Sequence, residues 1–362
     1  MTISINPLAK NIAVDVFCGV GGLTYGLARE GINVVAGIDA DSTCRFAYER
    51  NNPDARFIEG DVQSLPVSEI EQLYGAGAVR ILAGCAPCQP FSRYTQRYAK
   101  NEDSADQKWA LVSRFAEIIV SVSPHIVTME NVPELTKHAV FEDFVRTLQK
   151  AGYFVSHSTV QCADYGVPQS RLRLVLLASK LGKIEFLPPT HKGKHKTVAD
   201  AIGRLERIDA GMQSSRDRLH RASGLSALNL RRIMNTPEGG SWRNWPKELL
   251  LECHKKESGK SFGSIYGRMW WNKPSPTITT EFHGLGSGRF GHPVQHRAIS
   301  IREAALLQSF PKSYKFVPPR ESYSIDAVAR HIGNAVPVRL GQIIGRSINK
   351  HLSEHSHSDR ET

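Results

Sequence analysis

Residues 15–23 read DVFCGVGGL, a run in which glycines separate an apolar stretch from an amphipathic one. Glycines between a strand and a helix leave the backbone bare, so a nucleotide-like ligand can approach it closely. The dinucleotide pattern would need a further glycine where Thr24 stands, so the run departs from the NAD fingerprint. It predicts a tight strand-to-helix turn that either binds a cofactor or is only a turn.

Short β-branched runs alternate with amphipathic stretches around this turn, which is typical of βαβ units and a parallel sheet. The predicted strands are 12–17, 34–38, 81–83 and 126–129, and the predicted helices are 23–30, 43–50, 109–122 and 141–151. Two further strands, 154–160 and 172–178, complete the sheet. Later helices are predicted at 301–308, where Ser300 and Glu303 form a capping box, and at 338–351. The fold class is therefore α/β.

The bulk composition is that of an ordinary globular protein. With 362 residues, 41% hydrophobic and 22% charged, the chain can form a large domain and a smaller one. It starts without a charged segment followed by an apolar run, and no later stretch is long enough to span a bilayer. We therefore expect a cytoplasmic protein without a membrane anchor. In that compartment the cysteines should be reduced thiols: Cys18, Cys44, Cys85, Cys88, Cys162 and Cys253.

Positive charge is concentrated in one part of the chain. The formal net charge is +11, and residues 191–260 carry 15 Lys and Arg against 8 Asp and Glu. Such an excess suits a polyanionic partner, because lysine and arginine release the counterions condensed on phosphates. The change of composition after residue 187 predicts a domain boundary. We expect a main domain from 1–185 and 296–352, a second domain at 186–295, and a disordered tail at 353–362.

Two acids follow predicted strands after the glycine turn. Asp39 comes about 20 residues after the turn, where a carboxylate can accept hydrogen bonds from two ribose hydroxyls. Asp61 follows the next short apolar run. Each alone is more often a solvated loop acid or a helix cap. Together with the glycine turn, they favour an adenosyl pocket.

Residues 83–92 read AGCAPCQPFS and follow an apolar strand, so they should lie on a loop where open α/β sheets bind ligands. Two prolines stiffen the backbone around Cys88, and a nearby positive charge would help its thiol to ionise. The alternatives are a buried thiol, or Cys85 and Cys88 as a zinc or redox pair. A zinc site would lack further ligands, because there is no second Cys-x-x-Cys, and His191 and His195 lie about 100 residues away.

The order of several short motifs points to one family. They are FCGVGGL at 17–23, PCQ at 87–89 with FS at 91–92, ENV at 130–132, QSRLR at 169–173, REA at 302–304 with QSFP at 308–311, and GNAVP at 333–337. In this order they resemble the cytosine-5 DNA methyltransferases of bacterial restriction-modification type. One departure is Cys85, where the family more often has a small residue or proline. A second thiol there would make the site sensitive to oxidation.

The resemblance implies a Rossmann-like, S-adenosylmethionine-dependent methyltransferase sheet with a smaller target-recognition domain. It implies that S-adenosylmethionine becomes S-adenosylhomocysteine, with no metal. Cys88 would add to carbon 6 of a flipped cytosine, and Glu130 would stabilise charge at ring nitrogen 3. Arg173 would hold the base carbonyl and orient Glu130, while Arg171 would support the loop or a phosphate. The alternative for Arg171 and Arg173 is a pair of surface arginines without a functional role.

The same resemblance assigns two further sets of residues. The expected cofactor-binding residues are Phe17, Gly19, Gly21, Gly22, Leu23, Asp39, Asp61, Leu111, Asn334 and Val336. The expected DNA contacts are Gln89, Ser92, Arg93, Arg97, Arg243 and Arg268, with solvated loop charges as the alternative. Readout of the DNA sequence is expected in the basic region, which also offers stacking surface from Trp242, Trp245, Tyr266, Trp270 and Trp271.

The expected partner is double-stranded DNA, which would bring the enzyme to the nucleoid. A cognate restriction endonuclease encoded nearby is a further expectation, without a stable complex, and the enzyme should be a monomer. One alternative keeps the chemistry but takes cytosine in transfer RNA as substrate. Another is a catalytically silent DNA-binding module, against which the intact Cys88, Glu130 and Arg173 argue.

Overall fold

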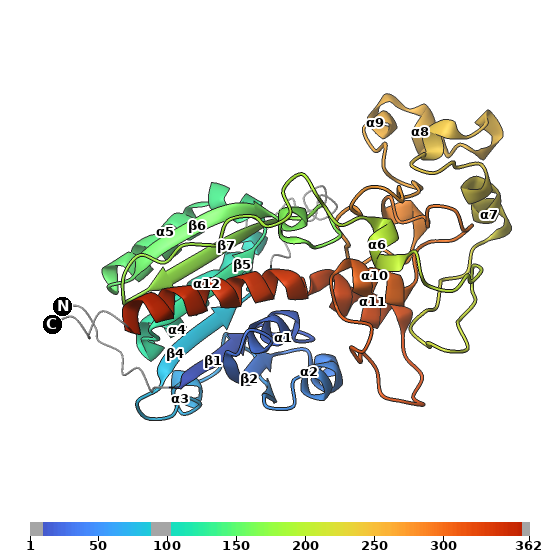
Figure 1. The fold of residues 1–362 in the computed structure, drawn as a ribbon. Helices are drawn as coiled ribbons and strands as arrows, with labels where there is room; N and C mark the ends of the chain where they lie inside the picture. The colour runs from blue at the N-terminus through green and yellow to red at the C-terminus, as the bar shows by residue number, and fades with distance from the viewer. Residues whose placement is uncertain (1–9, 88–102, 357–362) are drawn as a thin grey trace. The chain divides into compact units, whose positions relative to one another are not determined.

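The computed structural model describes residues 10–87 and 103–356 (Figure 1). Several residues with an expected role therefore lie outside the described residues: Cys88, Gln89, Ser92, Arg93 and Arg97. None of the helices in the described part of the chain is long and apolar enough to cross a membrane.

The chain divides into two compact units. Unit 1 comprises Met1–Gln161, Leu172–Pro188 and Val338–Thr362, and unit 2 comprises Cys162–Arg171 and Pro189–Pro337. Residues 296–337, which we expected to return to the main domain, belong to unit 2 in this division. Which unit serves catalysis and which serves recognition remains a prediction.

Unit 1 is built on a seven-stranded sheet in the order β3-β2-β1-β4-β5-β7-β6. The strands are β1 (Asn11–Val16), β2 (Asn33–Asp39), β3 (Arg56–Glu59), β4 (Val79–Gly84), β5 (Ile126–Asn131), β6 (Phe154–Gln161) and β7 (Leu172–Ser179). The first five are parallel, whereas β7 pairs antiparallel with both β5 and β6. Because the strand order reverses between β1 and β4, the carboxyl ends of these two strands form the switch point where such sheets bind ligands.

Helices cover both faces of the sheet (Figure 1). They are α1 (Gly22–Ala28), α2 (Arg45–Asn51), α3 (Val67–Glu71), α4 (Asp103–Val122), α5 (Ala139–Lys150) and α12 (Val338–Ser356). Phe115 of α4 and Phe144 of α5 join Val16, Leu82 and Val127 of the strands in one buried apolar cluster. The parallel strands are apolar on both faces because helices bury both of them.

On the other face, α1 packs closely on α12. A Cβ added at Gly26 would lie 2.7 Å from the Cα of Gly341, so the two helix backbones touch. At the other end of this helix pair, the carboxylate of Glu30 accepts hydrogen bonds from Gln342 at 3.0 Å and from Arg346 at 2.8 Å. The helix α12 was expected over 338–351. It starts where predicted but continues to Ser356, beyond the start of the expected tail.

Unit 2 has little regular structure. Its helices are short: α6 (Val198–Ile202), α7 (Ala227–Met234), α8 (Glu252–Lys255), α9 (Glu257–Lys260), α10 (Ile301–Leu307) and α11 (Ile325–Asn334). The capping box predicted at the start of α10 is confirmed, because Ser300 and Glu303 cap each other's backbone amides. The patterning predicted α10 but did not predict α6, α7, α8, α9 or α11.

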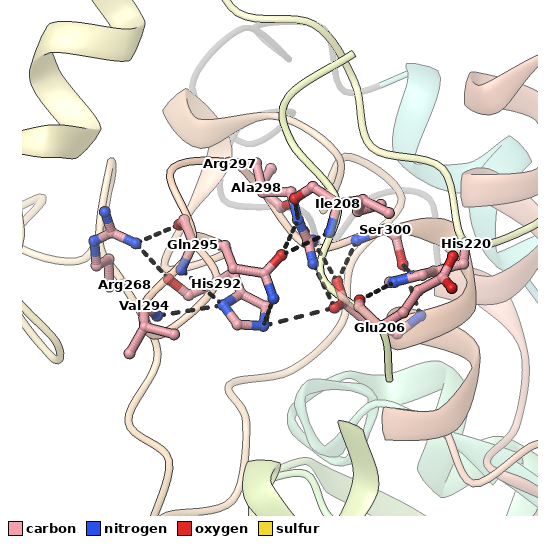
Figure 2. Close-up of polar contacts among 11 residues, drawn as sticks. Glu206, Ile208, His220, Arg268, His292, Val294, Gln295, Arg297, Ala298 and Ser300 are labelled. Atoms are coloured by element: carbon pink, nitrogen blue, oxygen red, sulfur yellow. Dashed lines mark hydrogen bonds and ion pairs between the residues drawn. The ribbon is translucent and has the colours of Figure 1, made fainter. Parts of the chain in front are cut away.

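A buried polar network replaces part of the apolar core in unit 2 (Figure 2). Arg297, fully buried, donates to both oxygens of Glu303 at 2.7 and 2.8 Å. Burial alone would raise the pKa of Glu303, but the hydrogen bonds and charge of Arg297 lower it to about 2. Burial lowers the pKa of the adjoining His292 to about 4. The network ties the start of α10 to residues 206–220, since the ring of His220 contacts both Ser300 and the carbonyl of Glu206.

Candidate active site

Three strands of unit 1 bring polar side chains to one edge of the sheet. The parallel pairing of β4 with β5 places Gly84 opposite Met129, so the chain leaves β4 beside the end of β5. The antiparallel pairing of β5 with β7 places Glu130 opposite Val175 and Asn131 opposite Leu174. Residues far apart in the sequence thus meet where β4 and β5 end and β7 begins.

Glu130 is the centre of this group. Its side chain is 3% exposed, and its Oε1 lies 2.8 Å from Nε of Arg173 in an ion pair. The thiol of Cys85 donates to the other oxygen, Oε2, with Sγ at 3.0 Å. Sequence reasoning expected Arg173 to orient Glu130, and the structure brings these two side chains together. The sequence did not predict a contact between Cys85 and Glu130.

Asn131 ties the end of β5 to the loop after β4. Its Nδ2 donates to the carbonyl of Ala86 at 3.3 Å, and its Oδ1 accepts from the amide of Val132 at 2.8 Å. Asn131 is 2% exposed, so these bonds are shielded from water. They hold the backbone two residues before Cys88.

The glycine turn has the backbone that its sequence predicts. Gly19 and Gly21 have positive φ angles of 51° and 85°, and Phe17, although not a glycine, has φ 63°. Such a conformation is uncommon for an aromatic residue. The amides of Phe17 and Cys18 both donate to the carbonyl of Ile38, at 2.8 and 3.1 Å, which holds the turn against the end of β2.

Asp39, at the end of β2, is bound into this turn. One of its carboxylate oxygens accepts from the amide of Gly19 at 2.8 Å, and the other accepts from the amide of Asp41 at 2.9 Å. Each carboxylate oxygen has a further lone pair, so Asp39 retains acceptors for a diol. The structure therefore places the turn and the acid in one fixed unit.

The other expected cofactor residues of unit 1 lie near the same strand ends. Phe17 packs edge-on against Phe115, with ring centroids 6.3 Å apart, and remains partly exposed. A Cβ added at Gly19 would meet no atom of the described residues within 4 Å, so those residues leave space open beside the turn. Asp61 is exposed beyond β3, and Leu111 is half-buried on α4. Gly22 and Leu23 form the buried start of α1. This donor set fits an adenosyl group.

Asp15, the first residue of the DVFCGVGGL run, is a buried carboxyl for which the sequence predicted no role. It has no exposed surface, and its Oδ2 accepts from the hydroxyl of Thr24 at 2.6 Å. Its Oδ1 has no hydrogen-bond partner among the described residues. Burial raises the pKa of Asp15 to about 7. An acid on β1 directly before a glycine turn is the sequence signal that could have identified it.

The other expected residues lie in unit 2. Arg171 is buried and donates to the carbonyls of Ile278 at 3.0 Å and Gly333 at 3.4 Å. It thus ties three segments of unit 2 together and has different partners from Arg173. Asn334 ends α11 and is exposed, whereas Val336 is 5% exposed.

Arg268 corrects one expectation. It is 2% exposed, and its guanidinium donates to the carbonyls of Thr236 at 2.6 Å, Ile233 at 2.9 Å and His292 at 2.7 Å. Figure 2 shows it directed into the network, toward His292 and Gln295. Its donors are engaged by backbone carbonyls and by the ring of His296, so Arg268 is a structural residue and the expected DNA contact at this position is wrong.

Arg243 remains exposed, with its guanidinium 5.7 Å from the ring centroid of Trp242. Among the aromatic residues of this region, Trp242 and Trp245 are buried and pack with Leu249 in an apolar cluster. These two tryptophans are therefore core. Tyr266, Trp270 and Trp271 are half-buried.

Comparison with solved structures defines the class of the fold. A methyltransferase of Entamoeba histolytica aligns over 95% of this chain and 99% of its own, with a TM-score of 0.68 and 16% identity. A DNMT2 mutant of Spodoptera frugiperda aligns over 94% of this chain and 100% of its own, with a TM-score of 0.65 and 17% identity. The sheet thus has the Rossmann-like fold of these methyltransferases.

Sequence comparison gives the family. The family model of C-5 cytosine-specific DNA methylases matches residues 12–350. The chain is 51% identical to the Type II methylase M.HgiDII of Herpetosiphon aurantiacus, over 94% of this chain and 95% of that protein. It is 29% identical to the Type II methyltransferase M.PspPI of a Psychrobacter species, over 97% and 82%. The chain belongs to the C-5 cytosine-specific DNA methylase family, as its motifs predicted, and is a DNA (cytosine-5-)-methyltransferase.

Proposed function

We propose that this enzyme methylates carbon 5 of a cytosine rotated out of a specific duplex DNA sequence, through a covalent bond between Cys88 and carbon 6. The observation that carries the proposal is the buried Glu130 carboxylate, held by Arg173 beside the strand end that leads to Cys88. A buried glutamate needs a positively charged or hydrogen-bonding partner, and buried charged side chains of this kind are common at reaction centres.

The chemistry requires a nucleophile because carbon 5 of cytosine is too electron-poor to attack a methyl sulfonium. The thiolate of Cys88 forms a bond to carbon 6, which makes carbon 5 an enamine carbon, and negative charge grows at ring nitrogen 3. Glu130 stabilises that charge by hydrogen bonding or proton transfer. S-adenosylmethionine supplies the electrophilic methyl group. The proton on carbon 5 then leaves to a base, and the electron pair expels the thiolate.

Unit 1 supplies cofactor-binding groups that match this role. Phe17 offers a face for adenine, Asp39 offers carboxylate acceptors for the ribose hydroxyls, and exposed Asp61 offers one for the adenine amino group. Among residues 10–87 and 103–356, the amide of Gln63 donates to Oδ1 of the Asp61 carboxylate at 2.9 Å, and the other oxygen, Oδ2, accepts no hydrogen bond. The proposal thus uses acceptors that the fold leaves accessible.

Base rotation is necessary because carbon 5 inside a duplex cannot reach the thiol, and lost stacking costs a few kcal/mol. We assign Gln89, Ser92, Arg93 and Arg97 to gripping the extruded base and its phosphates. We assign readout of the DNA sequence to the basic segment of unit 2, in which Arg243 is exposed.

We also propose that the enzyme protects host DNA within a restriction-modification system. Its support is that M.HgiDII and M.PspPI are named as Type II enzymes. Expression in a host that lacks cytosine methylation, followed by bisulfite sequencing of a plasmid, tests it. The expected result is one short sequence methylated at every occurrence, whereas methylation scattered over unrelated sequences would contradict a protective role.

The covalent step is tested with Cys88→Ala. We expect methyl transfer to fall below detection while S-adenosylmethionine binding, measured by calorimetry, persists. Duplex DNA containing 5-fluorocytosine should trap the wild-type enzyme in a complex that survives denaturing electrophoresis, because fluorine cannot leave as the proton does. Full activity in the alanine variant would refute the covalent mechanism.

A further inference from the structure

We infer that Cys85 is a positioning residue for methyl transfer, which holds the Glu130 carboxylate in its working orientation through an S–H···O hydrogen bond. The inference rests on the proposed function, in which Glu130 faces the target base. It concerns a residue of this chain for which the family pattern gave no role.

The first support is the geometry of the carboxylate. Nε of Arg173 lies 2.8 Å from Oε1 in an ion pair that is not aligned as a hydrogen bond, whereas the Cys85 thiol donates a hydrogen bond to Oε2 at 3.0 Å. With a partner on each oxygen, rotation of the carboxylate about its last side-chain bond would break at least one of these contacts. Arg173 alone, bound to one oxygen, would leave that torsion broad, as terminal carboxylate torsions generally are.

The second support is burial. Glu130 is 3% exposed, so water has little access to replace a missing donor. A thiol is a weak donor in water, but a hydrogen bond to a buried carboxylate gains strength from the low local dielectric. Loss of the thiol would therefore leave Oε2 undersatisfied.

The third support is the rigidity of the backbone that carries the thiol. The amide of Cys85 donates to the carbonyl of Val16, which extends the pairing of β4 with β1 beyond the end of the strand. The next residue is held by the bond from Asn131 to the carbonyl of Ala86. The sulfur is thus presented from a fixed backbone, as a group that preorganises a catalytic side chain should be.

The inference also accounts for the unusual residue type. A small residue or proline at position 85 would offer no side-chain donor to Oε2. A serine hydroxyl would offer such a donor. Serine at position 85 should therefore support methyl transfer better than alanine. Positioning acts on the reacting geometry, so it should change kcat more than the KM for either substrate.

Two matched pairs of variants test this: Cys85→Ser with Cys85→Ala, and Cys85→Thr with Cys85→Val. Threonine and valine have nearly the same shape and differ in the hydroxyl donor, so packing effects largely cancel in that pair. Serine and alanine differ by the hydroxyl group alone, without a branch at Cβ. We expect kcat of the hydroxyl member to exceed that of its partner roughly tenfold, since one hydrogen bond to a charged group is at stake. The KM values for S-adenosylmethionine and DNA should agree within each pair.

Equal kcat within both pairs would overturn the inference, and if one pair fails to fold, the other decides. Cys88→Ala is assayed in parallel. Methyl transfer by Cys88→Ala would refute the covalent mechanism, whatever the two pairs show. An inactive Cys88→Ala with equal kcat in both pairs would refute only the role of Cys85.

Discussion

Two arginines of unit 2 show how one residue type takes opposite roles. Arg243 is exposed beside Trp242, while Arg268 is buried among backbone carbonyls. A buried carbonyl that loses its donor costs about 1–3 kcal/mol, whereas a surface arginine contributes little to stability. The burial of each guanidinium, more than its charge, decides its role.

We therefore predict that Arg268→Ala lowers the free energy of unfolding by about 3 kcal/mol or more, because several carbonyls lose their donor at once. Arg243→Ala, its matched control, should leave unfolding within about 0.5 kcal/mol of wild type and weaken DNA binding. Chemical denaturation and a fluorescence binding assay measure the two effects. Similar stability losses in both variants would contradict this division.

Asp15 predicts a pH dependence of stability. Its folded-state pKa of about 7 lies above its ordinary value of 3.8, so between these values the folded state binds the proton more tightly. The contribution of Asp15 is fully present below about pH 4 and is lost as pH rises through about 7. Thermal unfolding from pH 5 to pH 8 should therefore show a larger loss for wild type than for Asp15→Asn. Parallel pH profiles of the two proteins would contradict the raised pKa.

At the scale of elements, the contact between α1 and α12 depends on the absence of a side chain. A Cβ at Gly26 would lie 2.7 Å from backbone atoms of α12, which cannot move as a flexible side chain can. Gly26→Ala should lower the free energy of unfolding by about 1–3 kcal/mol, although alanine is the better helix former. Gly75→Ala is the control, because of the residues that the structure describes its Cβ would meet only Ile12, at 3.8 Å. Denaturation curves that place Gly26→Ala at or above the control would refute the close contact.

The elements also show how well local patterns predict a fold. Most strands and helices of the first half were predicted to within a few residues, because buried parallel strands are continuous apolar runs. The short elements β3 and α3 were not predicted, and α4 starts at Asp103 and not at residue 109. The antiparallel direction of β7 and the presence of α11 were not predicted. Strand direction follows from pairing with β5 and β6, which no local window contains.

At the scale of the whole molecule, the net charge of +11 predicts salt-sensitive DNA binding. Each phosphate contact contributes about 0.9 to the slope of log affinity against log salt. Replacing exposed Lys192, Lys194 and Lys196 with glutamine should flatten that slope by up to about 3, if the basic segment contacts DNA. Replacing exposed Lys137 and Lys150 of unit 1 with glutamine should leave the slope unchanged. Titrations at several salt concentrations that show equal slopes would contradict the assigned interface.

The sequence by itself determined the α/β class, the family and the identity of the proposed reacting groups, because these depend on local periodicity and on the order of short motifs. Tertiary structure decided which polar groups are buried and what they contact. It buried Arg268, left Arg243 in solvent, withdrew Asp15 from water and placed the Cys85 thiol on Glu130. Each of these depends on segments distant in the chain that supply the neighbours, and desolvation and hydrogen bonding are properties of that packed environment.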